Sequence, residues 1–191
     1  IQIIKKLRIP LLGTHNIKNS VAATALALTL GLPILNIKNG LKNFKGVQRR
    51  FNKIFTYNKV DFYDDYAHHP TEIEVVLEGV KEVYNSFEKV CVFQPHRISR
   101  LKDLRKKFSF AFKNADTVVL CPIFTAGEKI KLGFNYLNFA KEIIKNSKVK
   151  LFLVNDKIQL AKFLKKNMYG KKIVIAMGAG SISNWMKELP K

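Results

Sequence analysis

The chain has 191 residues, of which 47% are hydrophobic, so it can bury the core of one large domain or of one domain plus part of another. Lysine and arginine outnumber aspartate and glutamate by 34 to 14, which gives a formal net charge of +20 at pH 7. Such a charge is typical of proteins that bind nucleic acid or a membrane surface. Here the lysines are spread along the whole chain and no nucleic-acid recognition motif accompanies them, so we expect neither partner.

The apolar stretches indicate a protein of a reducing, cytoplasmic compartment. The longest of them, residues 21–30, is too short to span a bilayer. Cys91 and Cys121 each lie inside a short apolar run, which predicts buried free thiols, and their spacing is not that of a metal site. The chain opens Ile-Gln-Ile-Ile-Lys-Lys, without an initiator methionine or a signal-peptide pattern, and this opening suggests a fragment.

The first 45 residues are expected to be mostly helical. A short strand-like piece covers residues 1–12. A helix follows from Thr14, its expected N-cap, to about residue 30, where glycine and proline give a stop signal. A second short helix is predicted over residues 37–44, and a domain boundary near residue 45.

The remaining residues alternate between strands and helices. A strand from Arg49 to about Tyr57 would place Arg49 and Arg50 on opposite faces, and a tight turn at residues 58–59 leads into the next strand. Further strands are predicted over residues 89–94, 116–121, 149–154 and 172–177, and helices over about 70–86, 101–113, 135–146 and 156–167. This alternation predicts an α/β fold with a doubly wound, mostly parallel sheet.

Polar residues gather where one expected strand ends and the helix at Pro70 begins. The segment 64–73 reads Asp-Asp-Tyr-Ala-His-His-Pro-Thr-Glu-Ile and holds two of the four histidines of the chain. In open α/β sheets, ligands bind at the carboxyl ends of strands. Each of these side chains alone is compatible with a solvated loop, but together they indicate a ligand site.

A second polar group, His-Arg-Ile-Ser-Arg at residues 96–100, is expected in the loop after strand 89–94. If the two loops follow neighbouring parallel strands, they should emerge at the same edge of the sheet. Arg97 and Arg100 could then hold a carboxylate or a phosphate between them. Solvated arginines in a basic protein are the alternative.

Three weaker features can each be interpreted in two ways. Asn16 and Asn19 lie three residues apart, and so on one face, at the start of the first helix, where they could contact a nucleotide or only serve the helix end. The turn at residues 178–181, Gly-Ala-Gly-Ser, lacks the full dinucleotide fingerprint, so close backbone packing explains it better than a phosphate site. Glu128, in the loop expected over residues 122–133, could orient an arginine or close over a site.

Four segments together resemble the Mur ligases, the ATP-dependent amino-acid ligases of peptidoglycan synthesis. They are Gly-Thr-His-Asn-Ile-Lys-Asn at 13–19, Phe-Lys-Gly-Val-Gln-Arg-Arg-Phe at 44–51, Asp-Tyr-Ala-His-His-Pro-Thr-Glu at 65–72 and Phe-Gln-Pro-His-Arg at 93–97. The resemblance implies a Rossmann-like C-terminal ligase domain over residues 46–191, preceded over residues 1–45 by the tail of the central ATP-binding domain. The phosphate loop and the magnesium ligands would lie upstream, so the fragment alone is expected to be inactive.

The resemblance also implies a reaction and a set of contacts. ATP, with Mg as its metal, would convert the carboxylate of UDP-N-acetylmuramate to an acyl phosphate, which the amine of L-alanine attacks. Nucleotide contacts are implied for Asn16, Asn19, Arg50 and Asp65. The resemblance implies that the pocket for alanine and the acyl phosphate is formed by Tyr66, His68, His96, Arg97 and Arg100. No catalytic residue or metal ligand is assigned within this chain.

Two alternatives stay open. A sister ligase that attaches a recycled peptide to the same sugar nucleotide shares much of the His-His-Pro-Thr region, and it would differ in amino-acid specificity. A basic nucleic-acid-binding module would show an affinity that falls steeply with salt.

Overall fold

The structure is a computed structural model that describes residues 3–11, 13–128 and 134–189. The chain divides into two compact units, Ile1–Val47 and Gln48–Lys191, close to the boundary expected from the sequence. We describe each unit by itself. Among the described helices, none combines the length and the hydropathy that crossing a membrane requires.

The first unit contains two helices, α1 (Thr14–Thr29) and α2 (Ile34–Asn43). The expected strand near the start of the chain is wrong, because residues 3–11 form no strand. Gly13, with a φ of 88°, is the N-cap of α1 in place of Thr14. This backbone conformation favours glycine, since a residue with a β-carbon is strained there. The second helix begins three residues earlier than expected, directly after Pro33.

Most large apolar side chains of the first unit remain exposed. Only Thr24 and Ile37 are buried among its described residues. Leu26, Leu30 and Leu35 are 63%, 72% and 67% exposed, and several other aliphatic side chains of this unit are exposed as well. Two short helices with so little buried surface do not make a stable core. This unit therefore needs further protein surface to cover it.

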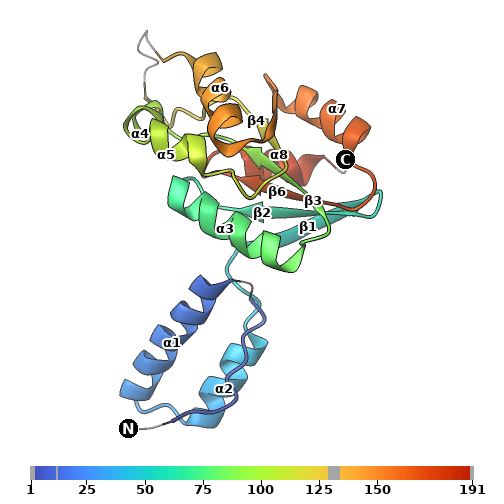
Figure 1. Cartoon of the computed structure of the whole chain (residues 1–191). Helices are drawn as coiled ribbons and strands as arrows, with labels where there is room; N and C mark the ends of the chain where they lie inside the picture. Colours follow the sequence, from blue (N-terminus) through green and yellow to red (C-terminus); the bar gives the residue numbers. More distant parts are fainter. Residues whose placement is uncertain (1–2, 12, 129–133, 190–191) are drawn as a thin grey trace. The chain divides into compact units, whose positions relative to one another are not determined.

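A six-stranded sheet forms the centre of the second unit (Figure 1). Its strands are β1 (Asn52–Tyr57), β2 (Val60–Asp65), β3 (Glu88–Phe93), β4 (Thr117–Leu120), β5 (Lys150–Leu153) and β6 (Lys172–Met177). They lie in the order β1-β2-β6-β3-β4-β5. Among the described strands, only β1 pairs antiparallel, with β2, and the other four pairings are parallel. The predicted α/β fold with a mostly parallel sheet is confirmed.

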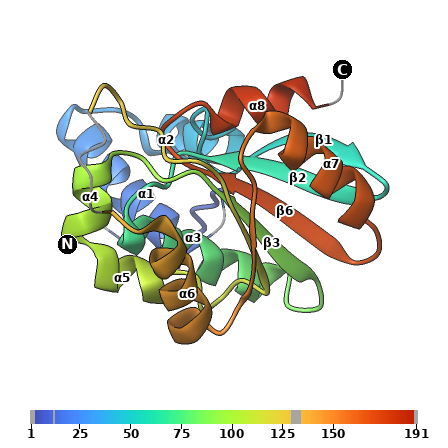
Figure 2. The same ribbon diagram turned by 90° about the horizontal axis from the view of Figure 1, so that it is seen from above.

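Helices cover both faces of this sheet (Figure 2). One face carries α3 (Pro70–Val83), α4 (Ile98–Asp103), α5 (Arg105–Phe110) and α6 (Tyr136–Ser147), and the other carries α7 (Lys157–Asn167) and α8 (Ile182–Glu188). Successive strand residues alternate between the two cores. Cys91 and Phe93 pack on the α3 side, whereas Val90 and Val92 pack on the α7 side. The sheet is therefore doubly wound, and both cysteines are free and buried, as predicted.

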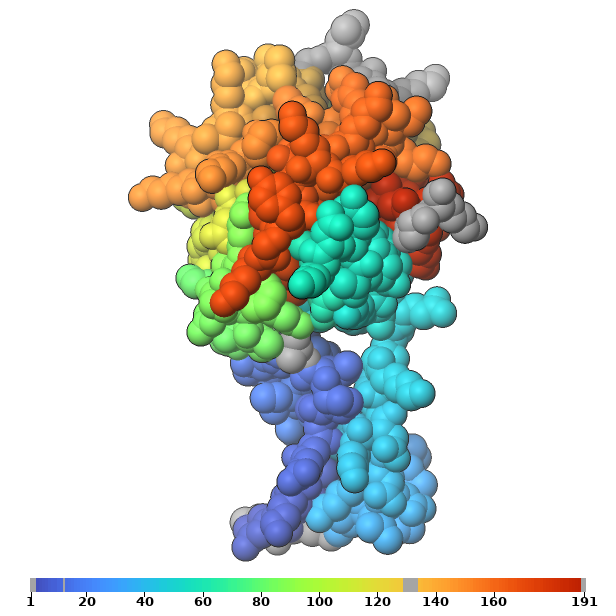
Figure 3. Space-filling view, turned by 90° about the vertical axis from the view of Figure 1, so that its right-hand side faces the viewer, coloured from blue at the N-terminus to red at the C-terminus, as the bar shows by residue number. Residues whose placement is uncertain are grey.

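The tight turn between β1 and β2 is also as predicted. Asn58 and Lys59 have φ values of 50° and 65°, a combination typical of two-residue hairpin turns. The Asn58 side chain donates to the Met168 carbonyl at 3.4 Å, so the hairpin tip lies beside the segment that follows α7 (Figure 3).

The strand expected to open at Arg49 begins three residues later, at Asn52. Arg49 and Phe51 have φ values of 58° and 51°, so the two adjacent arginines lie in a turn and do not alternate across a strand. Bonds to the end of β2 explain the difference. The Phe51 N–H donates to Asp65 Oδ2 and the Tyr66 N–H donates to the Arg49 carbonyl, both at 2.8 Å.

The helix expected over residues 101–113 also differs. It begins at Ile98 and breaks at Leu104, which separates α4 from α5. The chain turns into α4 at Arg97, whose φ is 69° and whose N–H donates to the Phe124 carbonyl at 2.9 Å. This turn buries Ile98 and Leu101 in the core, which explains why the first helical turn starts before the periodic apolar pattern does.

Candidate functional site at the carboxyl edge of the sheet

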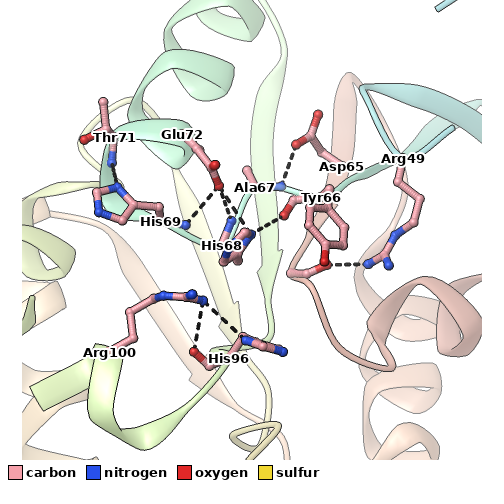
Figure 4. Close-up of polar contacts among 11 residues, drawn as sticks. Arg49, Asp65, Tyr66, Ala67, His68, His69, Thr71, Glu72, His96 and Arg100 are labelled. Carbon is pink, nitrogen blue, oxygen red and sulfur yellow. Dashed lines mark hydrogen bonds and ion pairs between the residues drawn. The ribbon is translucent and has the colours of Figure 1, made fainter. Parts of the chain in front are cut away.

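The loops that follow β2 and β3 lie together at one edge of the sheet (Figure 4). Their strands are not neighbours, contrary to expectation, because β6 lies between them. The loops nevertheless meet beyond the end of β6. The rings of His68 and His96 are 5.9 Å apart between centroids, at an angle of 67°.

Asp65 fixes the loop that leaves β2. Its side chain is only 3% exposed. Oδ1 accepts the Ala67 N–H and Oδ2 accepts the Phe51 N–H, both at 2.8 Å. Burial raises the pKa of Asp65, although these two hydrogen bonds and the charge of Arg50 act in the opposite direction. A ribose hydroxyl could use only the lone pairs that the backbone leaves on this carboxylate.

A capping box fixes the start of α3. Glu72 Oε2 accepts the backbone N–H groups of His68 and His69 at 3.0 and 3.1 Å, and His69 Nδ1 accepts the Thr71 N–H at 3.3 Å. Burial alone would raise the pKa of Glu72. The two backbone hydrogen bonds outweigh it, helped by the charges of His68 and Arg50, and the pKa is lowered. Both histidines are therefore held by their backbone as well as by their rings.

The ring of His68 is oriented by its neighbours. Its Nδ1 lies 2.9 Å from the Tyr66 carbonyl and 3.4 Å from Glu72 Oε2. Both partners can only accept, so we assign the hydrogen to Nδ1. The Tyr66 ring meets the His68 ring edge-on, with 5.2 Å between centroids.

His96 is held by an arginine and an aromatic ring. Arg100 Nη1 lies 3.3 Å from His96 Nδ1 and 3.4 Å from the His96 carbonyl, and the imidazole stacks on Phe124 at 5.5 Å. Because arginine can only donate, His96 Nδ1 is the acceptor. Burial lowers the pKa of His96, and the charge of Arg100 adds to this effect. The ring is therefore neutral at pH 7.

Arg97 and Glu128 border the same loop. The Arg97 side chain is exposed, and its charge also contributes to the lowered pKa of His96. Glu128 accepts the backbone N–H of Ser99 at 3.0 Å and the Ser99 hydroxyl at 2.5 Å. Its hydrogen bonds therefore orient the start of α4, and the charge of Arg97 also acts on its carboxyl group. The loop expected over residues 122–133 is described only as far as Glu128, and residues 129–133 lie outside the described part.

The residues assigned to the nucleotide belong to both units. Arg50 is exposed, and its charge acts on the carboxyl groups of Asp65 and Glu72, so it lies near the loop that leaves β2. Asn16 and Asn19 lie three residues apart near the start of α1 in the first unit. The Asn16 N–H donates to the carbonyl of residue 13 at 3.0 Å, and the Asn19 side chain is exposed.

Close packing explains the glycine-rich turn after β6, as preferred from the sequence. A β-carbon on Gly178 would lie 2.7 Å from the Gln94 carbonyl oxygen, and one on Gly180 would lie 2.5 Å from Phe124 Cγ. Both distances are too short for real contacts. Sequence reasoning missed Phe124 as a support of His96, and no local pattern singles it out. It also missed Arg49, although the adjacent-arginine pattern had drawn attention to its position.

The arrangement suits a small anionic ligand. Two arginines, two imidazoles and a tyrosine lie on the two loops that meet here, and guanidinium groups match the geometry of carboxylates and phosphates. Within the described residues, no group of three or more His, Cys, Asp or Glu side chains is placed to hold a metal ion. The fold and site thus define a doubly wound domain in which basic and aromatic side chains gather at the carboxyl edge of the sheet.

Comparisons with known proteins identify the family. The family model described as "Mur ligase, glutamate ligase domain" matches residues 49–180. The chain belongs to the Mur ligase family, which confirms the resemblance of its four segments.

Among its relatives are two proteins named UDP-N-acetylmuramate–L-alanine ligase. The one from Pelagibacter ubique is 66% identical over 98% of this chain and 40% of its own length, and the one from Rickettsia canadensis is 40% identical over 99% and 40%. The crystal structure of UDP-N-acetylmuramate–alanine ligase from Thermotoga maritima matches 96% of this chain and 39% of its own, with 27% identity and a TM-score of 0.79. The chain thus spans about 40% of the length of these relatives.

Proposed function

We propose that the chain is the C-terminal part of an ATP-dependent ligase that joins L-alanine to UDP-N-acetylmuramate through an acyl phosphate, in peptidoglycan synthesis. The relatives that match nearly its whole length carry that name. The protein acts in the cytoplasm, without a nucleic-acid or membrane partner. Because the chain spans about 40% of these relatives, ligation also needs the portion that lies upstream in them.

The observation that carries this proposal is the meeting of the His68 and His96 loops at one edge of the sheet. Arg100 contacts His96, and the exposed Arg97 lies one residue further along the chain. The planar donors of an arginine suit the carboxylate of an amino acid. A neutral His96 does not repel the ammonium form of alanine, whereas an imidazolium would. Tyr66 and His68 complete the wall of this alanine pocket.

The exposed apolar faces of the first unit support its assignment as the tail of a larger ATP-binding domain. Its aliphatic side chains need a covering surface, and the upstream portion of the relatives is long enough to supply one. In this proposal Asn16 and Asn19 contact the nucleotide from that domain. Arg50 and Asp65 contact it from the C-terminal domain.

ATP and Mg are the cofactors that the proposal assigns to the complete protein. Mg²⁺ prefers oxygen ligands and screens phosphate charge. The described residues offer no acidic cluster for it, so we place its ligands upstream. What the C-terminal domain supplies to the nucleotide is one exposed guanidinium, from Arg50, and the residual acceptor capacity of Asp65.

A chimera tests the proposal. The upstream portion of the Pelagibacter ubique relative, joined to this chain in place of its own matched C-terminal segment, should release phosphate from ATP only when UDP-N-acetylmuramate and L-alanine are both present. The 191-residue chain alone should show no ligation. A well-folded chimera that is inactive with alanine would contradict the proposal.

The same assay separates the alternatives. A sister ligase would accept a peptide with an N-terminal L-alanine in preference to free alanine. Both acceptors should therefore be compared at equal concentration. A nucleic-acid-binding module would retard DNA in a gel, and the retardation would weaken steeply as salt increases. The proposal expects free alanine to be the better acceptor and no salt-sensitive DNA complex beyond that of a lysine-rich protein of similar charge.

A further inference from the structure

Arg49 joins its own turn to two other segments at the carboxyl edge of the sheet. Its Nη2 donates to the carbonyl of Gly178 at 2.5 Å, and its Cζ lies 4.6 Å from the centroid of the Tyr66 ring. Its own carbonyl accepts the Tyr66 N–H at 2.8 Å. The turn before β1, the end of β2 and the turn after β6 therefore converge on this residue (Figure 4).

A buried carboxylate lies below the guanidinium. Asp64 is 2% exposed, and its Oδ2 accepts the Ser183 hydroxyl at 2.5 Å and lies 3.8 Å from Arg49 Nε. Asp64 Oδ1 and Arg49 Nε are both buried without a hydrogen-bond partner among the described residues. Each charge would be costly to bury alone, so their proximity holds the guanidinium at this place.

Tyr66 connects this arginine with the rings of His68 and His96. The centroid of its ring lies 4.6 Å from Arg49 Cζ. The same ring meets the His68 ring edge-on, with 5.2 Å between the two centroids. The His68 ring is followed by that of His96 at 5.9 Å. A continuous row of planar groups thus runs from Arg49 into the proposed alanine pocket. Tyr66 is 38% exposed, so solvent on one side leaves its ring free to turn unless a neighbour holds it.

We propose that Arg49 is a positioning residue of the acceptor cleft, which fixes the Tyr66 ring against His68 and so sets the shape of the pocket for the amino-acid substrate. The inference rests on the proposed function and adds a residue that acts only through Tyr66. Lysine cannot replace it, because an ammonium is a point charge that offers no planar face to the ring while donating to the Gly178 carbonyl. Arg50, its neighbour, makes no such contact within the described residues and keeps the separate nucleotide role proposed for it.

The test is a double-mutant cycle in the chimera. Arg49→Lys keeps a positive charge near Asp64, and so avoids leaving that carboxylate alone, but it loses the planar contact. We expect Arg49→Lys and Tyr66→Leu each to lower kcat/KM for alanine roughly tenfold, which is within the range of a partly desolvated cation–π contact. The kcat/KM of the double variant should be no lower than that of the less active single variant, because the two residues act as one unit. KM for ATP should be unchanged in all three.

Independent losses that multiply to roughly a hundredfold, or a rise in KM for ATP, would overturn the positioning role. Lys162→Gln, an exposed change on α7, is the matched control and should leave the kinetics unchanged. Thermal unfolding of each variant should begin near the same temperature, since a purely structural defect would lower it together with activity.

A second readout does not depend on ligation. In NMR spectra of the 191-residue chain, Tyr66→Leu should move the Arg49 side-chain Nε–H resonance, because an aromatic ring 4.6 Å away shifts it, and should leave that of Arg50 in place. An unmoved Arg49 resonance would overturn the inference even in an active chimera. An inactive chimera with a shifted resonance would instead contradict the proposed function and retain the Arg49–Tyr66 contact.

Discussion

Arg100 donates to the ring of His96 through Nη1, 3.3 Å from Nδ1, so the arginine and the unprotonated imidazole are partners across the first turn of α4. This contact links the charge of Arg100 to the protonation state of His96. It also explains why an arginine can lie beside a histidine without repulsion, because the imidazole stays neutral.

His96 should titrate below the ordinary histidine value of 6.5. Burial is the main cause, and Arg100 is the next. In an NMR titration of the chain, Arg100→Met should raise the His96 midpoint towards 6.5, since a cation is removed. The His96→Gln variant, which lacks the imidazole, identifies the resonance that belongs to His96. A midpoint above 6.5 in the unsubstituted chain would contradict the described environment.

The lowered pKa of His96 also determines how the free energy of unfolding changes with pH. Between the lowered pKa and about 6.5 the unfolded chain binds the His96 proton more readily than the folded chain does. The free energy of unfolding should therefore fall as the pH drops through this window and level off below it. His96→Gln should remove this component, as measured by denaturant unfolding followed through Trp185, the only tryptophan.

Asp65→Asn should destabilise the second unit by about 1–3 kcal/mol, because the new amide can accept only one of the two backbone N–H groups and leaves the other buried without a partner. The same denaturation experiment measures the change. Asp61→Asn, on the same strand but in a surface pair with Lys53, is the control and should cost less than about 1 kcal/mol. Equal losses for the two variants would contradict the structural role of Asp65.

Gly180→Ala should cost about 1–3 kcal/mol, because the added β-carbon overlaps Phe124 and forces it to move. The displaced Phe124 ring should also move the His96 resonances, since the two rings are stacked. Gly40→Ala, in the interior of α2 with no neighbour within 4 Å, should instead be neutral or stabilising. A harmless Gly180→Ala would mean that the turn after β6 is more open than described.

Glu72→Gln should weaken the start of α3 by about 1 kcal/mol at pH 7, as the loss of a helix cap does. The pKa of Glu72 is lowered from 4.5, so its stabilising contribution is complete above that value and is lost as the pH falls through the lowered pKa. The difference between Glu72→Gln and the unsubstituted chain should therefore shrink in acid. Glu78→Gln, exposed on the same helix, is the control and should change the free energy of unfolding at pH 7 by less than about 0.5 kcal/mol.

Much of the fold could be predicted because local patterns specify it. The continuous apolar strand Lys172–Met177 can be identified from its residues alone, since a parallel strand is buried on both faces. The start of β1 and the start of α4 could not, because distant partners decide them. Asp65 binds the turn at Phe51, and the Phe124 carbonyl binds the turn at Arg97.

The site was only partly predictable for the same reason. Loops after parallel strands were expected to share an edge, and the approach of His68 and His96 follows from that rule even though β6 separates their strands. Arg49 could not be distinguished from Arg50 in the sequence. Its contact with Gly178 joins residues 129 positions apart, and no local pattern reports such a contact.

The central claim is that this cleft binds the alanine, and KM measurements on the chimera test it most directly. Arg97→Ala should raise KM for alanine roughly ten- to a hundredfold, the range expected for losing a hydrogen bond to a charged group. Arg97→Lys should also raise it, because a point charge does not replace the planar fork. Lys102→Ala, exposed on the helix that Arg97 caps, is the control and should change neither KM value. The account predicts a raised KM for alanine with an unchanged KM for ATP. An unchanged KM for alanine together with a raised KM for ATP would contradict it, because the cleft would then belong to the nucleotide.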